Sequence, residues 1–213
     1  MEPLFLAVIC GCNAGLFHEA LHEIYIPRIQ RGDAFFAAKV LGARGALLSA
    51  LVHFFERGRW GLFAEQGVEG QSLTAEGQLF ILMQAGLYLT ATRGFAAPEA
   101  LICYERAESL CVSLNRPLVL FSALRGLWRY SLVSDKLSTA MQIAQRVYSL
   151  AQNQNDSALM MGAYRAFGSH ALLSGRFRVR ATIRDAGCSD LALWWRAVSG
   201  RRDYRARRLL FDI

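Results

Sequence analysis

The chain has 213 residues and a formal net charge of +7; 54% of the residues are hydrophobic, 19% are charged, and there are only 4 prolines. This composition excludes an intrinsically disordered chain, which is poor in large apolar groups, and a collagen-like chain, which needs abundant proline and a glycine period. The length is enough for one or two domains with a buried core. We therefore expect a globular protein whose architecture is easier to derive than its activity.

The positive charge is concentrated at the C-terminal end. Residues 176–213 hold ten arginines against four aspartates, whereas residues 1–175 hold fourteen Lys/Arg against thirteen Asp/Glu. The net charge is therefore +6 for the tail and +1 for the rest. A basic surface of the kind that attracts nucleic acid is expected only in the tail.

Neither the cysteines nor the apolar segments indicate export or membrane insertion. The five cysteines are odd in number, lie in apolar helical segments and include no CxxC pair, which favours buried, reduced thiols. Glu2 stands where a signal peptide carries basic residues. Lys39 and Arg44 interrupt the apolar stretch 34–55, and a charge at the centre of a bilayer helix costs about 3 kcal/mol or more. We expect a cytoplasmic protein without a transmembrane helix.

The apolar periodicity predicts helices along most of the chain. The first two long helices are expected over 34–55 and 73–92, the second with Gly94 as a left-handed C-cap. The glycine-rich segment 61–71 between them is expected to be irregular. Further helices are predicted over 100–114, after a start at Pro98, and over 118–133, 137–152 and 157–173, the last with Asp156 or Asn155 as its N-cap. Since no segment alternates with period two for long, the predicted fold class is all-α.

The two helices predicted over 137–152 and 157–173 repeat the sequence pattern of the two predicted over 100–114 and 118–133. When the chain is shifted so that Ala140 falls on Ala100, nine of 35 aligned positions are identical, where chance gives about two or three. Helix pairs that bury one face only against their neighbours form a solenoid. Two tandem units are therefore predicted, with identities at Ala100 and Ala140, Arg106 and Arg146, Ser109 and Ser149, Leu110 and Leu150, Asn115 and Asn155, Ala123 and Ala163, Arg125 and Arg165, Leu132 and Leu172, and Ser134 and Ser174.

The small and aromatic residues of the second unit resemble tetratricopeptide-type repeats. The W-x-x-L-G-x-x-Y…G-x-Y positions of that family fall on Tyr164, Phe167, Gly168, Ala171, Gly175 and Phe177. The offset from Ala100 to Ala140 exceeds the usual repeat of that family, which is about 34 residues long. The longer repeat implies extended turns.

Four longer stretches resemble the C-terminal helical-repeat region of large bacterial proteins that join a class III nucleotide cyclase-like domain to a signalling ATPase. These stretches are GCNAGLFHEALHEIYIPRIQRGD (11–33), LGARGALLSALVHFFERGRWG (41–61), EGQSLTAEGQLFILMQAGLYLTATRG (69–94) and MQIAQRVYSLAQNQND (141–156). The resemblance implies a tetratricopeptide-like helical-hairpin solenoid over residues 1–177. It further implies a non-catalytic interaction or regulatory module, whose partners are a protein, a peptide or other domains of a larger signalling protein.

The catalytic motifs of those signalling proteins are absent from this sequence. A P-loop needs a lysine after glycine, but Lys39 and Lys136 are the only lysines, and they follow Ala38 and Asp135. A two-metal cyclase site needs paired aspartates, and Asp33 is the only aspartate that precedes Asp135. We therefore expect no enzyme activity and no cofactor.

The repeat pattern ends at residue 178. Arg180 occupies the position of Ala100 and Ala140, where closely crossing helices need a small residue. We interpret 178–213 as a poorly ordered tail translated out of frame, and the chain as a fragment whose exposed helix faces promote self-association. The alternative is a nucleic-acid-binding tail, with phosphate contacts and base stacking from Arg201, Arg202, Arg205, Arg207, Arg208, Trp194, Trp195 and Tyr204.

His18, Glu19 and His22 form an HExxH motif. Histidines at the first and fifth positions of such a motif share a helix face and can both bind zinc, while the glutamate acts as a general base. His53 or Glu56 would supply a third ligand. A zinc metallohydrolase is therefore an alternative function, and the favoured interpretation of the motif is an amphipathic helix surface without a metal.

Several features argue against catalysis. Glu23 follows the second histidine, where metallopeptidase helices usually keep an uncharged residue, and Pro27 is expected to end the helix soon after. Cys103 and Cys111 share an apolar helix face, where a buried thiol is inert. His170 is interpreted as a packed histidine rather than a base.

Arg125, Arg129 and Arg165 are the predicted binding residues. Arg125 and Arg165 occupy equivalent places in the two units, so they are expected to point the same way, and Arg129 lies about one helical turn after Arg125. The tetratricopeptide resemblance implies a groove along this helix that binds acidic or extended peptides. A solvated face with local ion pairs is the favoured interpretation.

Overall fold

The computed structural model describes residues 2–64, 72–154 and 156–173 of the chain. Helices dominate these residues, and the one strand-like pairing among them is an isolated antiparallel bridge between Phe55 and Phe63. The all-α fold class predicted from the sequence is confirmed. The predictions for 178–213 and for Asn155, Gly175, Phe177 and Arg180 lie outside the described residues, as do the side chains of Ala171 and His170.

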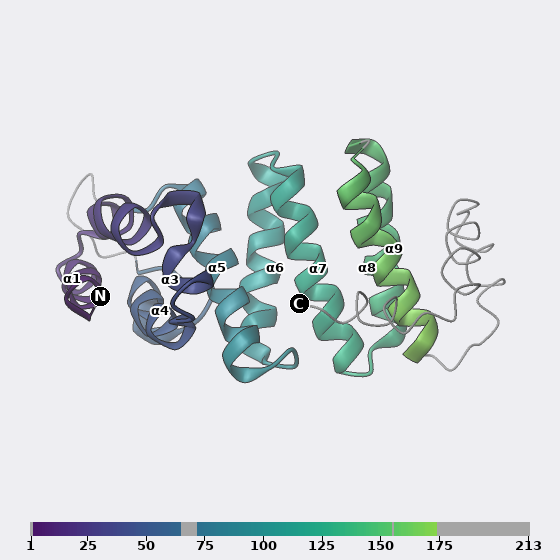
Figure 1. Cartoon of the computed structure of the whole chain (residues 1–213), viewed down its shortest axis with the longest axis horizontal. Coiled ribbons are helices and arrows are strands. Elements are labelled where there is room, and N and C mark those ends of the chain that lie inside the picture. The colour runs from purple at the N-terminus through teal and green to yellow at the C-terminus, as the bar shows by residue number, and fades with distance from the viewer. Residues whose placement is uncertain (1, 65–71, 155, 174–213) are drawn as a thin grey trace.

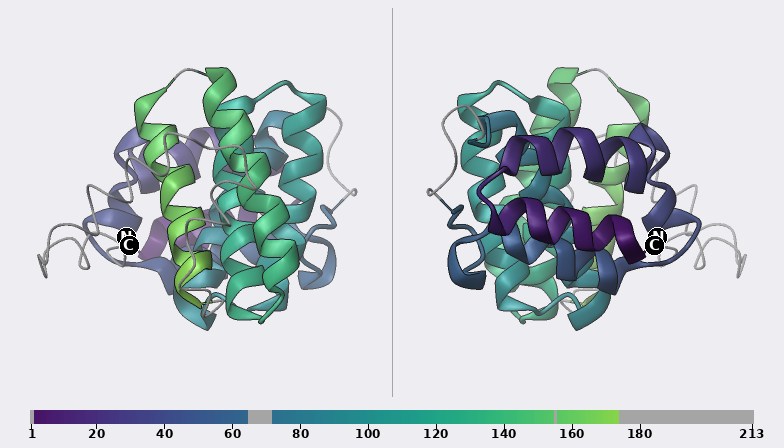
Figure 2. Two further views of the ribbon diagram at one scale, coloured as in Figure 1. Left: turned by 90° about the vertical axis from the view of Figure 1, so that its right-hand side faces the viewer. Right: turned by 90° about the vertical axis from the view of Figure 1, so that its left-hand side faces the viewer.

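Short helical segments build the N-terminal part: α1 (Glu2–Asn13), α2 (Phe17–Glu19), η1 (Ala20–Gln30), η2 (Gly32–Ala34), α3 (Phe36–Lys39), α4 (Arg44–Leu51), η3 (Val52–Phe54) and η4 (Glu56–Gly58). Helices α1 and η1 lie side by side at this end of the molecule (Figure 2). Helix η1 is a π-helix and continues past Pro27 to Gln30, so the expectation that Pro27 ends the helix is wrong. The wider π turn relieves the clash between a proline ring and the carbonyl of the preceding turn.

The single helix predicted over 34–55 is also wrong. The chain breaks between α3 and α4, where Gly42 adopts a φ of 62° that glycine accepts without a Cβ clash. The segments 32–39 and 44–54 meet at 116°, and no single described helix is long and apolar enough to cross a membrane. The bend keeps the charged Lys39 and Arg44 exposed while both segments bury their apolar faces.

Five longer helices build the C-terminal part: α5 (Ala75–Arg93), α6 (Pro98–Ser113), α7 (Pro117–Val133), α8 (Leu137–Gln154) and α9 (Ser157–Leu173). Their ends lie close to the predicted ends. The turns between them are short, so the expectation of extended turns is wrong. The additional length lies in the helices, of which α6 is the shortest with 16 res and α5 the longest with 19 res.

The predicted caps are largely present. Pro98 occupies the first position of α6, where its missing N–H costs no hydrogen bond. Asp156 is the N-cap of α9, because its Oδ1 accepts from the backbone N–H groups of Ala158 at 2.7 Å and Leu159 at 3.2 Å. Gly94 is the C-cap of α5, but its φ of 93° and ψ of 170° lie outside the predicted left-handed helical region.

Helices α5 to α9 follow one another in chain order along the long axis of the molecule (Figure 1). Each packs against the next, and α7 also contacts α5 and α9. The buried faces include Ala100, Tyr104, Ala107 and Cys111 on α6 and Leu124, Leu127, Trp128 and Ser131 on α7. Helix α7 therefore lies next to both α5 and α9.

One tyrosine fills the space where α5, α6 and α7 meet. A Cβ atom on Gly86 of α5 would lie 2.8 Å from the ring of Tyr104 on α6, and a Cβ atom on Gly126 of α7 would lie 2.6 Å from the same ring. Both glycines thus leave room for the ring. Gly86 and Gly126 are separated by the same offset as Ala100 and Ala140.

A buried polar network joins the N-terminal part to α5. The Nε2 of Gln30, at the end of η1, donates to the hydroxyl oxygens of Tyr25 at 3.1 Å and of Tyr88 at 2.8 Å. The Tyr88 hydroxyl donates in turn to Gln84. Gln30 is fully buried, and its Oε1 has no hydrogen-bond partner among the described residues.

Candidate binding surface on helices α7 and α9

The two histidines of the HExxH motif are neighbours, but the expected third ligands are elsewhere. His18 of α2 and His22 of η1 have ring centroids 4.5 Å apart. His53 shares a hydrogen bond with Asn13 at 3.3 Å, and Glu56 pairs with Arg59 at 3.5 Å. Among the residues that the structure describes, no group of three or more His, Cys, Asp and Glu side chains is placed to hold a metal ion.

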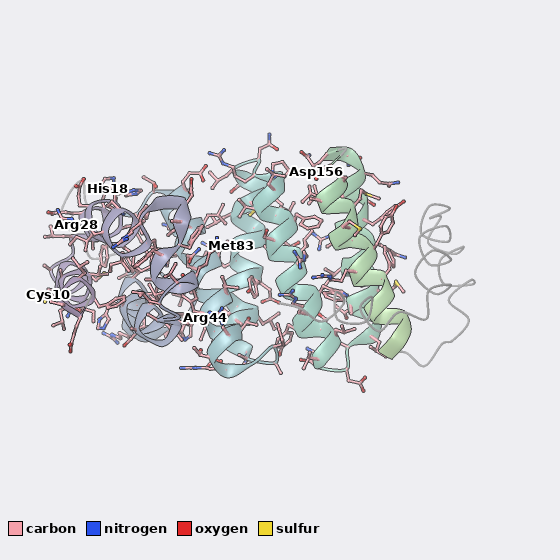
Figure 3. The ribbon with its side chains drawn as sticks, viewed as in Figure 1. Cys10, His18, Arg28, Arg44, Met83 and Asp156 are labelled. Carbon is pink, nitrogen blue, oxygen red and sulfur yellow. The ribbon has the colours of Figure 1, made fainter. Side chains whose placement is uncertain are left out.

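His53 and Glu56 instead line a pocket of about 650 Å³ with Asn13, Phe17 and Arg57. Neither His18 nor His22 lines this pocket. The two histidines and the expected third ligands of the zinc hypothesis therefore do not meet at one site in the described part of the chain. Figure 3 shows His18 near the N-terminal end of the molecule, far from α9.

The contact between the two histidine rings has a consequence for stability at low pH. Partial burial lowers the pKa of His22 below its ordinary 6.5, the charge of His18 lowers it further, and Glu23 raises it. The unfolded chain therefore takes up this proton at a higher pH than the folded chain. The stability contributed by neutral His22 is present above about pH 6.5 and is lost as the pH falls through the lowered pKa.

When the pH falls from about 7.5 to about 5.5, we therefore expect the free energy of unfolding to decrease less in His22→Gln than in the wild type. The difference is expected to be small, because water screens the exposed ring. Urea denaturation at both pH values measures it, with the wild type and the variant compared at each. Equal losses in the two proteins would contradict the lowered pKa of His22.

The described cysteines fall into two groups. Cys12, Cys103 and Cys111 are buried, and burial raises the pKa of Cys12 and Cys103 to about 12 and that of Cys111 to about 11. These thiols remain protonated and unreactive at neutral pH. Cys10 is exposed on α1, so the expectation that every cysteine is buried is wrong.

The three predicted binding arginines lie close together on two neighbouring helices. Arg125 and Arg129 extend from α7, and Arg165 extends from α9. Burial lowers the pKa of Arg125, and the positive charges of Arg129 and Arg165 lower it further. Burial also lowers the pKa of Arg129; Tyr104 opposes this effect and Arg165 adds to it. Like charges are thus held within reach of one another in a partly desolvated environment.

Aromatic rings support the two arginines of α7. The guanidinium carbon of Arg125 lies 6.0 Å from the ring centroid of Phe121, and that of Arg129 lies 5.5 Å from the ring centroid of Phe95. A cation over an aromatic face is attracted by the quadrupole of the ring, by about 0.5–1 kcal/mol at exposed sites. These rings therefore help to hold the guanidinium groups in place.

Arg125 and Arg129 have no carboxylate partner among the described residues. The ion pairs of that part of the chain join other arginines to glutamates: Arg59 to Glu56, Arg93 to Glu99, Arg116 to Glu76, and Arg146 to Glu108. Local ion pairs of the kind considered for a solvated face are thus found elsewhere on the helices. Within the described residues, the two half-buried charges on α7 are thus not compensated by a side-chain carboxylate.

A glycine that sequence reasoning missed brings α9 to α7. A Cβ atom on Gly162 would lie 2.9 Å from the ring of Phe121 and 3.9 Å from the Cδ of Arg125. Arg165 follows Gly162 by about one helical turn. Ser122 is the residue equivalent to Gly162 in the first repeat unit, so the repeat pattern contained no signal for this close approach.

Two exposed apolar side chains share the helix faces of these arginines. Leu118 is 57% exposed and lies about two helical turns before Arg125, and Met161 is 58% exposed and lies about one turn before Arg165. Residues at these spacings lie on the same face of a helix. We call the set the arginine surface: Leu118, Arg125, Arg129, Met161 and Arg165.

Comparisons with known proteins neither support nor oppose a function for this surface. The chain matches no protein-family model, no curated protein and no solved structure. The function is therefore proposed from the residues and their arrangement.

Proposed function

We propose that this chain is a non-catalytic, cytoplasmic protein-interaction module that binds an acidic segment of a partner protein across α7 and α9. The observation that carries the proposal is the pair of half-buried arginines, Arg125 and Arg129, which have no carboxylate partner among the described residues. Charges that repel one another and are partly desolvated lower the stability of a free protein. An anionic ligand relieves both costs and so gains affinity.

The helical architecture supports a binding role of this kind. We propose that α5 to α9 form a tetratricopeptide-like helical-hairpin solenoid, because each helix packs on the next and α7 also contacts α5 and α9. Repeat solenoids present extended surfaces built from successive helices. By the resemblance of the sequence, the partner is a protein or another domain of a bacterial cyclase/ATPase signalling protein.

The arginine surface matches an acidic peptide with apolar flanks. Guanidinium groups form two parallel hydrogen bonds with a carboxylate, and charge-assisted hydrogen bonds are roughly twice as strong as neutral ones. Phe95 and Phe121 limit the access of water to one side of the guanidinium groups. Leu118 and Met161 supply exposed apolar area beside the charges. Electrostatic attraction then sets the encounter rate, and the apolar contacts prolong the complex.

The test is binding of a fluorescent peptide of about twelve residues that alternates glutamate and leucine. Arg125→Ala combined with Arg165→Ala is expected to weaken binding by about tenfold or more, because each lost charge-assisted contact is worth about 1.5–3 kcal/mol. Fluorescence anisotropy measures the dissociation constant at low and high salt.

The matched control removes the same charge from α6 and α8. Arg106 and Arg146 are exposed, and neither belongs to the arginine surface. Arg106→Ala combined with Arg146→Ala is expected to leave the dissociation constant within about twofold of the wild type. Wild-type affinity in the Arg125/Arg165 variant, or an equal loss in the control, would overturn the proposed binding surface.

A further inference from the structure

We infer that the arginine surface recognises a phosphorylated side chain, a phosphoserine or phosphothreonine in an apolar segment of the partner. This inference rests on the proposed function and names the anion that the partner carries. It follows from the number of positive charges at one place, from their spacing and from the apolar residues beside them.

The first argument is the charge. A carboxylate carries one negative charge and two oxygens, whereas a phosphate monoester carries about −1.5 to −2 at pH 7 and three strong acceptor oxygens. Arg125 and Arg129 are both without a carboxylate partner among the described residues, and the charge of Arg165 acts on both. A single carboxylate would leave at least one of the two α7 arginines uncompensated, and a single phosphate compensates both.

The second argument is the spacing. Arg125 and Arg129 stand one helical turn apart on α7, so their Cβ atoms are separated by about 5–6 Å. The close approach of Gly162 to Phe121 and Arg125 brings α9 against the same place. Arg125 and Arg129 are therefore close enough for one group to contact both, and α9 packs against α7 beside Arg125. One compact group with several acceptor oxygens fits this pair better than a series of acidic residues along an extended chain.

The third argument favours a phosphorylated peptide over free phosphate. Leu118 and Met161 are more than half exposed on the helix faces that carry Arg125 and Arg165. Burying apolar side chains against a ligand is favourable in proportion to the area buried, and an inorganic anion has no apolar area to bury. Residues flanking the phosphorylated side chain have these two side chains to contact.

The test compares three peptides that differ at one central residue, which is serine, phosphoserine or glutamate, with leucines on both sides. We expect the phosphoserine peptide to bind the full chain about tenfold or more tightly than the glutamate peptide, because it makes additional charge-assisted hydrogen bonds. The serine peptide is expected to bind more weakly than both. Fluorescence anisotropy at one fixed ionic strength gives the three dissociation constants.

Two variants assign the effect to the arginines. Arg125→Ala combined with Arg129→Ala is expected to bring the phosphoserine and serine peptides to the same affinity. The charge-matched control, Arg106→Ala combined with Arg146→Ala, is expected to keep the full preference for phosphoserine. A preference that survives the first pair of substitutions would overturn the inference.

The remaining outcomes separate this inference from the proposed function. Equal binding of the glutamate and phosphoserine peptides would overturn the phosphate preference and leave the acidic-peptide surface standing. Equal binding of all three peptides, or of none, would overturn both. Displacement of the phosphoserine peptide by an equal concentration of inorganic phosphate would show an anion site without peptide recognition, and would also overturn the inference.

Discussion

Replacing Gly126 with alanine is expected to lower the free energy of unfolding by about 1–2 kcal/mol, although alanine favours a helix over glycine by about 1 kcal/mol. The new Cβ would lie 2.6 Å from the ring of Tyr104, which cannot retreat toward α5, because Gly86 approaches the same ring there. Overpacking a filled core typically costs about 1–3 kcal/mol. Urea denaturation followed by circular dichroism measures the change.

A helical glycine elsewhere in the chain provides the matched control. Gly45 lies in α4, and a Cβ there would have no neighbour within 4 Å. Gly45→Ala is therefore expected to leave stability unchanged or to raise it by up to about 1 kcal/mol. Equal effects of Gly126→Ala and Gly45→Ala would show that the Tyr104 ring does not limit the approach of α7.

A double-mutant cycle isolates the contact itself. Tyr104→Ala alone removes a large buried ring and is expected to cost about 3–5 kcal/mol. In that background Gly126→Ala is expected to be neutral or stabilising, because the ring that it strikes is absent. The coupling between the two positions is then about 1–3 kcal/mol, as found for residues in direct contact.

Replacing Gln30 with alanine is expected to lower the free energy of unfolding by about 3 kcal/mol. The substitution leaves a cavity between η1 and α5, and it removes the N–H donor from the buried hydroxyls of Tyr25 and Tyr88. Each lost hydrogen bond costs about 0.5–1.5 kcal/mol, and the cavity adds to that cost. Equilibrium urea denaturation at neutral pH is the measurement.

Two comparisons separate the cavity from the lost hydrogen bonds. Gln30→Met fills the space and removes the orphaned Oε1, so it is expected to cost less than Gln30→Ala. Gln152 of α8 also donates to a tyrosine, Tyr148 at 3.0 Å, but Gln152 is exposed. Gln152→Ala is expected to cost less than about 0.5 kcal/mol, since water replaces the bond. Equal losses at positions 30 and 152 would contradict the role of burial.

The predictability of the helices differed between the two parts of the chain. From Ala75 onward, prolines at helix starts and polar residues in the turns marked the ends, so those helices were predicted with nearly correct bounds. In the N-terminal part, the apolar run 34–55 was continuous, and its composition contained no clear sign of the bend at Gly42. Periodicity indicates that a face is buried, but it does not indicate whether one straight helix or two inclined ones bury it.

The candidate site was predictable in its residues but not in its chemistry. The equivalence of Arg125 and Arg165 and the helical spacing of Arg129 singled out the three arginines. Whether an arginine finds a glutamate depends on the neighbouring helices: Arg146 pairs with Glu108 of α6, and Arg125 has no such carboxylate among the described residues. The same dependence applies to the HExxH motif, whose two histidines meet while His53 and Glu56 do not join them.

Local sequence was enough to derive the all-α class, the helices of the C-terminal part and most of their caps, and to nominate the three arginines as candidates, because these follow from spacing along the chain and from the chemistry of single residues. Which residues touch one another became known only from the folded arrangement. The Tyr104 ring between Gly86 and Gly126, the buried network at Gln30 and the approach of Gly162 to Arg125 each join residues from different helices. Such contacts depend on how helices cross, which close packing of whole side chains sets and local periodicity does not encode.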